Sequence, residues 1–304
     1  MQWDELAQHA LDGLVLGLAV ALAAGGLIVV RSVARVTTVA QADTGVAASG
    51  LVLLLSVVGV RRLSFLPLVG ADGRVPLPIA LAIVLALAAV SGWLLDRLVW
   101  APLRRSGGLI ASLAASVALV VVARSGLGLA LGDDHRALLG RSHLVWKAGS
   151  FQVSPVVVVG IVAALAALAL LAHVVGRGPS AARIRAVADD PLLAAATGID
   201  PSRMARRAWM LASVLAAAGG VLLALHRGLD SRLADEMFVP VLVVGLIGRP
   251  GSLARAVGAS LALGVVIEFL ATDGVGLDLT REVAGGVALA ALLTVATRRD
   301  GIVR

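Results

Sequence analysis

Two charged residues, Arg124 and Glu268, stand inside long apolar stretches of the sequence. A charge in the hydrocarbon core of a bilayer is costly, so such residues usually pair with one another or line a path for a polar solute. One interpretation is that these two side chains pair with each other or with backbone groups. The other is that they lie beside the path of a zwitterionic solute. Ser125 adds a hydroxyl group next to Arg124, which either packs between helices or contributes to such a path.

No pattern for covalent or nucleotide chemistry accompanies these residues. The chain has no cysteine, a single lysine (Lys147), no Gly-x-x-x-x-Gly-Lys-[Ser/Thr] phosphate loop and no Gly-x-Ser-x-Gly turn. His135 and His143 share a segment with two aspartates, but their spacing matches no zinc motif. We therefore expect no enzyme activity, no cofactor and no metal in this chain, with any ATP hydrolysis residing in other subunits.

The elements that carry the two charges are membrane-spanning helices. Of the 304 residues, 59% are hydrophobic and only 15% are charged, too few for the surface of a water-soluble protein of this length. A bilayer core requires about 20 apolar residues per helix. We expect one domain, residues 1–304, built as an all-α polytopic bundle of about eight or nine transmembrane helices. The expected spans are 11–30, 46–60, 77–99, 109–131, 153–175, 204–225, 236–248, 253–271 and 283–297, of which the second and seventh are short and are candidates for half-spans.

The arginines between the apolar runs indicate the orientation of the chain in the membrane. The densest cluster lies in the loop 176–207, and placing it in the cytoplasm puts the N-terminus outside and the C-terminus inside. The net charge of +7 is then explained by topology and lipid head groups, and we expect no nucleic-acid partner. Residues 1–11 carry no basic residue, so no cleavable signal peptide is expected. Glycines at 13, 17, 25–26, 219–220 and 285–286 predict close helix packing.

The loop 176–207 contains two helix starts. Asp190-Pro191 and Asp200-Pro201 each combine an N-cap carboxylate with a proline at the first helical position, and Gly198 provides a stop. The pattern predicts helices over 181–189 and 191–197 and a third that begins at Pro201. Leu192 and Leu193 would be exposed on the short middle helix. Either this helix docks into a groove of another protein, or it lies at the lipid interface with Arg183 and Arg185 at the head groups.

Three blocks of the sequence resemble the permease subunits of ABC importers of the branched-chain amino-acid class. The first is the loop itself, Arg185–Asp190 with Gly198-Ile199, followed by Ala218–Leu222 in the next span. The second is Asp96–Arg105, followed by Leu109–Leu113. The third is the turn Gly248–Leu253, with Glu268 beyond it. The blocks occur in the family's order over about residues 11–297.

The resemblance implies a division of labour among several proteins. The partners would be two separate ABC ATPase subunits, a second permease subunit that is a copy or a relative, an extracytoplasmic substrate-binding protein and the lipid membrane, most simply the inner membrane of a bacterium. The substrate would be a branched-chain or other hydrophobic amino acid, or a related small solute. The residues expected to couple to the ATPase are Arg185, Asp189, Leu192, Leu193, Ala195, Gly198 and Ile199. The candidates for the substrate path are Thr38, Gln41, Asp43, Arg124, Ser125 and Glu268.

Two other functions remain open from the sequence. A gradient-driven secondary transporter would use Glu268 and Asp43 as coupling acids. A membrane partner that descends from permeases but does not transport would also fit, because the segment 38–43 keeps little of the family's pattern beyond an alanine and an acid.

Overall fold

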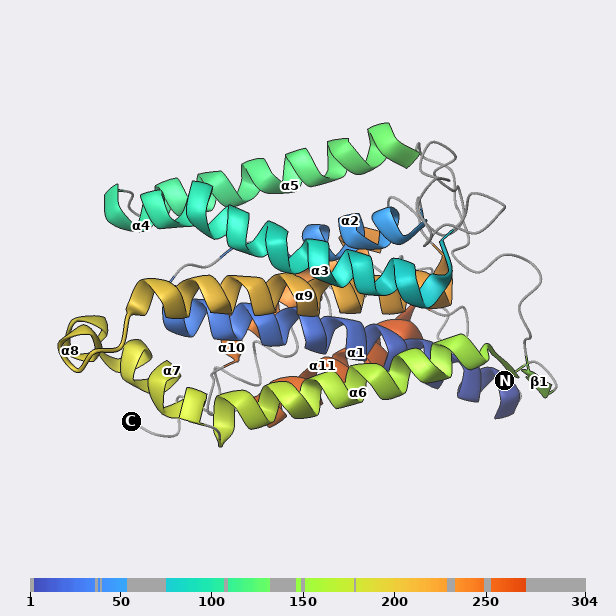
Figure 1. Cartoon of the computed structure of the whole chain (residues 1–304). Coiled ribbons are helices and arrows are strands. Elements are labelled where there is room, and N and C mark those ends of the chain that lie inside the picture. Colours follow the sequence, from blue (N-terminus) through green and yellow to red (C-terminus); the bar gives the residue numbers. More distant parts are fainter. Residues whose placement is uncertain are drawn as a thin grey trace.

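The computed structural model describes residues 3–35, 38, 40–53, 75–106, 109–131, 146–148, 151–177, 179–228, 233–248 and 253–271. Long helices run roughly side by side, with α8 at one end of the molecule and the N-terminus and β1 at the other (Figure 1). We call these the α8 end and the N-terminal end. The described elements are α1 (Trp3–Ala34), α2 (Gln41–Leu53), α3 (Leu77–Leu95), the π-helical turn η3 (Asp96–Trp100), α4 (Ala101–Ser106), α5 (Leu109–Leu131), β1 (Trp146–Ala148), β2 (Phe151–Val153), α6 (Pro155–Gly176), α7 (Pro179–Asp189), α8 (Pro191–Ala196), α9 (Pro201–Arg227), α10 (Leu233–Ile247) and α11 (Leu253–Leu270).

The helices confirm the predicted membrane bundle. Among the described residues, five helical stretches are long and apolar enough to cross a membrane: Leu6–Ala34, Leu77–Arg104, Pro155–Gly176, Pro201–Arg227 and Leu253–Leu270. They correspond to the predicted spans at 11–30, 77–99, 153–175, 204–225 and 253–271, and α5 covers the predicted span 109–131. The predicted span 283–297 lies outside the described residues. A short antiparallel hairpin of β1 and β2, which the sequence did not indicate, precedes α6.

Helices α1 and α9 form the centre of the bundle. Side chains all around α1 are buried from Val15 to Val30, because this helix is apolar on every face and is packed by α6, α9, α10 and α11. Helix α9 is buried along most of its length between α1, α2 and α3. Helices α5 and α6 lie at the outside (Figure 1) and expose many large apolar side chains, as helices that face lipid do.

Glycines allow the central helices to approach at backbone distance, as the sequence predicted. A Cβ atom placed on Gly13 or Gly17 of α1 would lie 2.6 Å or 2.7 Å from the Cα atoms of Val265 and Leu261 on α11. A Cβ atom on Gly220 of α9 would overlap the backbone of Gly45 on α2. Contacts of this kind replace the hydrophobic effect as the source of helix association inside lipid.

Helix α2 begins inside the bundle. Its first residue, Gln41, donates a 2.7 Å hydrogen bond from Nε2 to the carbonyl oxygen of Ala212, well inside α9. The sequence placed the start of this segment at 46. The helix begins earlier, since the polar side chains of its first turn find partners within the protein rather than in water. Residues 54–60 of the predicted span lie outside the described residues, so its short length stays a prediction.

Candidate functional site

The loop between α6 and α9 folds into two capped helices. The carboxylate of Asp190 accepts hydrogen bonds from the backbone N–H groups of Leu192 and Leu193, at 2.8 Å and 3.2 Å, and so starts α8. Asp200 starts α9 in the same way, accepting from Ser202 and Arg203. Gly198 lies between them with φ of 86°, a conformation that favours glycine. The predicted helices at 181–189, 191–197 and from Pro201 are therefore confirmed as α7, α8 and α9, within two residues at each end.

The N-cap at Asp200 is also an electrostatic feature. The backbone N–H groups of Arg203 and Ser202, together with the nearby Arg203 charge, lower the pKa of the Asp200 carboxyl from its ordinary value. The carboxylate therefore remains ionised at neutral pH and caps the N-terminus of α9.

Helix α8 presents two leucines to solvent. The side chains of Leu192 and Leu193 are 82% and 64% exposed, whereas Ala194 is buried against the bundle. Most of the other residues predicted to couple to an ATPase are exposed beside them, namely Arg185, Asp189, Ala195 and Gly198; Ile199 is half-buried and packs against the core. Six of the seven predicted residues are thus accessible at the α8 end. The seventh, Ile199, packs against the core.

Helix α7 fixes this region to the core of the bundle. Arg35, at the end of α1, donates two 3.2 Å hydrogen bonds from Nη2 to the carbonyl oxygens of Ala188 and Asp189, which lie in the last turn of α7. The side chains of Ala181, Ile184 and Val187 bury the other face of α7. The α7–α8 unit is therefore held at both its backbone and its apolar face.

A buried charge cluster joins α9 to α3 at the same end. The carboxylate of Asp96 is almost fully buried; its Oδ1 lies 2.7 Å from Nη2 of Arg104, and its Oδ2 lies 3.7 Å from Nε of Arg206. One turn away, the rings of Trp100 and Trp209 stack with centroids 4.8 Å apart. The resemblance placed Asp96 and Arg104 within one block of the sequence. The sequence analysis did not predict that Arg206 of α9 would approach Asp96, or that Trp100 and Trp209 would stack.

The π-helical turn explains how both Asp96 and Trp100 reach α9. The residues of α3 and η3 that are buried recur at every fourth position, and on a regular α-helix such a stripe drifts by about 40° per step. The last step of the stripe, from Asp96 to Trp100, lies in the π-helical turn. This turn contains more residues than an α-helical turn, so each residue rotates less about the axis and the drift is reversed there. The buried stripe consists of Ala80, Val84, Ala88, Gly92, Asp96 and Trp100.

Toward the N-terminal end, Arg124 of α5 forms two ion pairs. Its Nε lies 2.5 Å from Oδ1 of Asp43 on α2, and its Nη1 lies 2.7 Å from Oδ1 of Asp235 on α10. The guanidinium also lies 5.8 Å from the ring centroid of Phe238. The structure thus brings together two predicted path residues, Arg124 and Asp43, and adds Asp235, which the sequence analysis did not single out.

The remaining path candidates have different surroundings. Ser125 is exposed beside Arg124 on α5. Thr38 and Gln41 are buried and serve the start of α2, where the Thr38 hydroxyl accepts a hydrogen bond from the backbone N–H of Ala40. These two side chains therefore have structural partners, and any role toward a solute would be additional.

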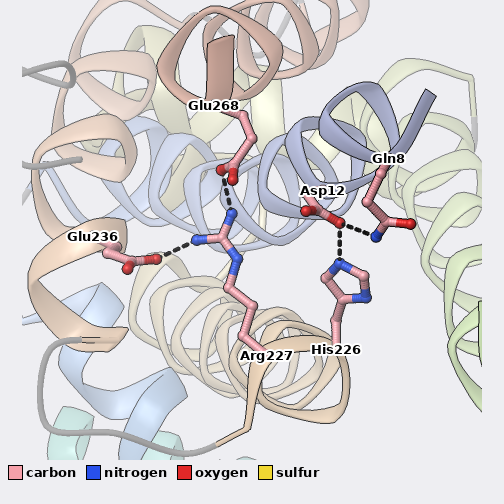
Figure 2. Close-up of polar contacts among 6 residues, drawn as sticks. All are labelled: Gln8, Asp12, His226, Arg227, Glu236 and Glu268. Atoms are coloured by element: carbon pink, nitrogen blue, oxygen red, sulfur yellow. Dashed lines mark hydrogen bonds and ion pairs between the residues drawn. The ribbon is translucent and has the colours of Figure 1, made fainter. Parts of the chain in front are cut away.

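Glu268 belongs to a second charge network (Figure 2). The guanidinium of Arg227, at the end of α9, bonds to Glu268 on α11 at 2.5 Å and to Glu236 in the first turn of α10. The interpretation in which Arg124 and Glu268 pair with each other is therefore wrong, because Arg124 forms its ion pairs with Asp43 and Asp235, and Glu268 forms its ion pair with Arg227. Beside this network, Asp12 of α1 bonds to His226 at 2.7 Å and to Gln8 at 2.9 Å.

The two networks form one charged layer. Asp235 and Glu236 are neighbours in the first turn of α10, and each bonds to a different arginine. The layer contains more carboxylates than arginines. His9, Asp12 and Glu268 also place one potential ligand atom each within 4.8 Å of one another, as a metal site would. Since Arg227 already pairs with Glu268 and His226 already bonds to Asp12, we assign no metal there.

Over residues 9–295, the sequence matches the family described as the permease component of the branched-chain amino acid transport system. The chain belongs to this family. A comparison with curated proteins and another with solved structures found no match. The permease is thus a multi-pass membrane protein and a transport subunit, and the matched range contains both the α7–α8 unit and the charged layer.

Three residues of the charged layer that the sequence analysis missed in the permease share a common property. Arg227, Asp235 and Glu236 lie at the ends of spans, where charged residues are ordinarily read as loop residues in water. The sequence signal for these contacts was the density of charged residues around 226–236. His226 and Arg227 lie in the last turn of α9, and Asp235 and Glu236 lie in the first turn of α10. Consecutive helices with these termini bring opposite charges to the same end of the bundle.

Proposed function

We propose that this permease is the membrane subunit of an ABC importer that moves a branched-chain amino acid, or a related small solute, with ATP hydrolysis performed by separate subunits. The observation that carries the proposal is helix α8, a short, doubly capped helix with two exposed leucines at one end of a membrane bundle. An apolar surface on a short, rigid helix beyond the ends of the spans fits a groove of another protein.

In this proposal the α8 end is cytoplasmic. Closure of the ATPase subunits on ATP moves α8, and the Asp200 cap transmits the motion to α9 because α8 and α9 are separated by only a short, hydrogen-bonded link. Arg206 and Trp209 of α9 contact Asp96 and Trp100 at the end of α3, so α3 would move together with α9. A rigid-body change of these helices would alternate the access of the path between the two sides.

The charged layer supports a polar path near the N-terminal end. The side chains of Arg124 and Asp235 are 40% and 41% exposed, although Arg124 belongs to the apolar helix α5. Exposing such groups to lipid is expensive, so we infer that this face borders water or a second permease subunit rather than lipid. An extracytoplasmic binding protein would deliver the solute at this end.

The gradient-driven alternative is less well supported by the geometry. It required Glu268 and Asp43 as coupling acids, and both carboxylates form ion pairs with arginine at 2.5 Å. The exposed helix α8 also has no role in a carrier that works alone.

The test is to purify the permease from its native membrane, most simply a bacterial inner membrane, in mild detergent and to identify its partners. We expect a phosphate-loop ATPase that is lost in Leu193→Arg. The matched control is Ala182→Arg, which adds the same charge to an exposed position of α7 and should keep the ATPase. Recovery of the permease alone from wild-type membranes, or retention of the ATPase by Leu193→Arg, would contradict the proposal.

A further inference from the structure

Two adjoining cavities lie at the α8 end, where the spans of α6 and α9 meet the loop. The first lies between α1, α6, α7 and α9, and the second lies between α7 and the α8–α9 link. Arg183, Met204 and Arg207 line both cavities, so the two adjoin at these three side chains, and we call the pair the groove. Span α6 ends at Gly176 and span α9 begins at Pro201, which places this groove at the boundary of the apolar bundle.

The inner half of the groove is apolar. It has a volume of about 120 Å³ and opens between the valines of α1 and α6 and the side chains of α7 and α9. Its apolar lining comprises Val29, Val33, Val174, Ile184, Met204, Ala208 and Leu211. The polar residues of its lining are Ser180 and the shared Arg183 and Arg207, and the rest of the space accepts a stretch of hydrocarbon chain.

The outer half of the groove is cationic. It has a volume of about 390 Å³, and Arg183, Arg203 and Arg207 line it together with Asp200. Arg203 forms an ion pair with Asp200 at 2.9 Å. Within the described part of the chain, Arg183 and Arg207 have no ion pair or hydrogen bond, so the mouth of the groove carries uncompensated positive charge.

We propose that this groove binds one anionic phospholipid, with the phosphate between Arg183 and Arg207 and part of an acyl chain in the apolar half. Arginine forks match the geometry of phosphate oxygens, and basic pockets between helices at the membrane boundary bind anionic head groups. A free phosphate would use only the outer half. A cationic cavity that adjoins a mostly apolar one at the same two arginines is what favours a lipid over a soluble anion.

The site would connect lipid composition to the α7–α8 unit. Arg183 belongs to α7 and Arg207 to α9, so a bound phosphate would join these two helices beside α8. The bound lipid would then hold the exposed region of α8 in one position relative to the bundle.

The test is native mass spectrometry of the full-length permease in detergent, titrated with phosphatidylglycerol, with phosphatidylcholine, or with inorganic phosphate. We expect one phosphatidylglycerol per chain, in preference to phosphatidylcholine. The double variant Arg183→Gln/Arg207→Gln should bind phosphatidylglycerol roughly 30-fold more weakly, from the ordinary contribution of two arginines near a lipid head group. Arg177→Gln is the matched control, since it removes an exposed charge from the same loop but lies outside the groove, and it should bind normally.

A second variant separates the lipid from a free anion. Val174→Phe fills the apolar half and leaves the arginines in place, so it should weaken phosphatidylglycerol binding while any weak binding of phosphate is unchanged. A monodisperse gel-filtration profile of each variant verifies folding. The proposal is overturned if phosphatidylcholine binds equally, if inorganic phosphate displaces the phospholipid at millimolar concentration, or if Arg177→Gln loses as much as the double variant. None of these outcomes depends on whether the permease engages an ATPase.

Discussion

Trp100 of the π-helical turn and Trp209 of α9 stack with their ring planes 2° from parallel and their centroids 4.8 Å apart. Both side chains are almost fully buried, and the Asp96–Arg206 ion pair lies one helical turn from them. A stacked aromatic pair adds to the stabilisation from buried area, so separating these two helices here would lose that contribution. The two contacts therefore couple the first turns of α9 to the end of α3, next to the region that we assign to ATPase docking.

The first prediction concerns this tryptophan pair. Stacked aromatic pairs contribute about 0.5–1.5 kcal/mol beyond the area they bury. Replacing Trp100 or Trp209 by leucine should each lower the thermal midpoint of the purified permease, and the double variant should lower it by less than the sum. The measurement is a double-mutant cycle on thermal unfolding in detergent. Strict additivity of the two substitutions would show that the rings do not stabilise each other.

The second prediction concerns the Asp96 carboxylate. Asp96→Asn leaves Arg104 and Arg206 without their anion, and breaking a buried ion pair typically costs about 3–5 kcal/mol. We expect a large loss of folded protein in Asp96→Asn and partial recovery when Arg206→Gln is added, because the second change removes a now unpaired charge. Yield by fluorescence-detected gel filtration provides the comparison. If the double variant is worse than Asp96→Asn alone, Arg206 has a role other than pairing with Asp96.

The third prediction compares two glycines of one helix. A Cβ atom on Gly264 of α11 would overlap the backbone of Gly13 and Gly17, whereas a Cβ atom on Gly258 would meet nothing within 4 Å. Gly264→Ala should therefore force α1 and α11 apart and sharply reduce stability. Gly258→Ala should be neutral or stabilising by up to about 1 kcal/mol, since alanine favours the helix. Equal thermal midpoints for the two variants would mean that α1 and α11 are not in backbone contact.

The sequence predicted the elements better than the polar contacts between them. Hydropathy located the long spans because about 20 consecutive apolar residues are a strong signal. The Asp-Pro pairs at 190–191 and 200–201 located α8 and α9, because N-capping depends only on neighbouring residues. Both kinds of information are local, so both could be read from the chain alone.

The partners of the buried charges could not be read in this way. Arg124 bonds to Asp43 and Asp235, which are distant from it in sequence, and Glu268 bonds to Arg227 rather than to Arg124. Which arginine meets which carboxylate depends on how α2, α5, α10 and α11 are placed around α9, and no periodicity in one segment specifies this. The tryptophan stack is missing from the sequence prediction for the same reason.

The last prediction tests whether the Arg124 face borders water. The chain has no cysteine, so a single introduced thiol can be labelled without a background. Ser125 is exposed beside Arg124, whose side chain is 40% exposed in an ion pair with Asp235. If this face lines a path, Ser125→Cys in intact membranes should react with a membrane-impermeant maleimide, and a transported solute should slow the reaction.

Val159→Cys supplies the contrast for that measurement. Val159 lies on α6 and its side chain is 68% exposed. Its neighbours along this helix are apolar. A thiol there would face lipid, where the impermeant maleimide cannot enter and the thiolate that would attack it does not form. Rapid labelling of Ser125→Cys with little labelling of Val159→Cys would place water at the Arg124–Asp235 pair. Equal resistance of both thiols, in variants that fold normally, would instead mean that a second protein chain or lipid covers α5, and the path would have to lie elsewhere in the bundle.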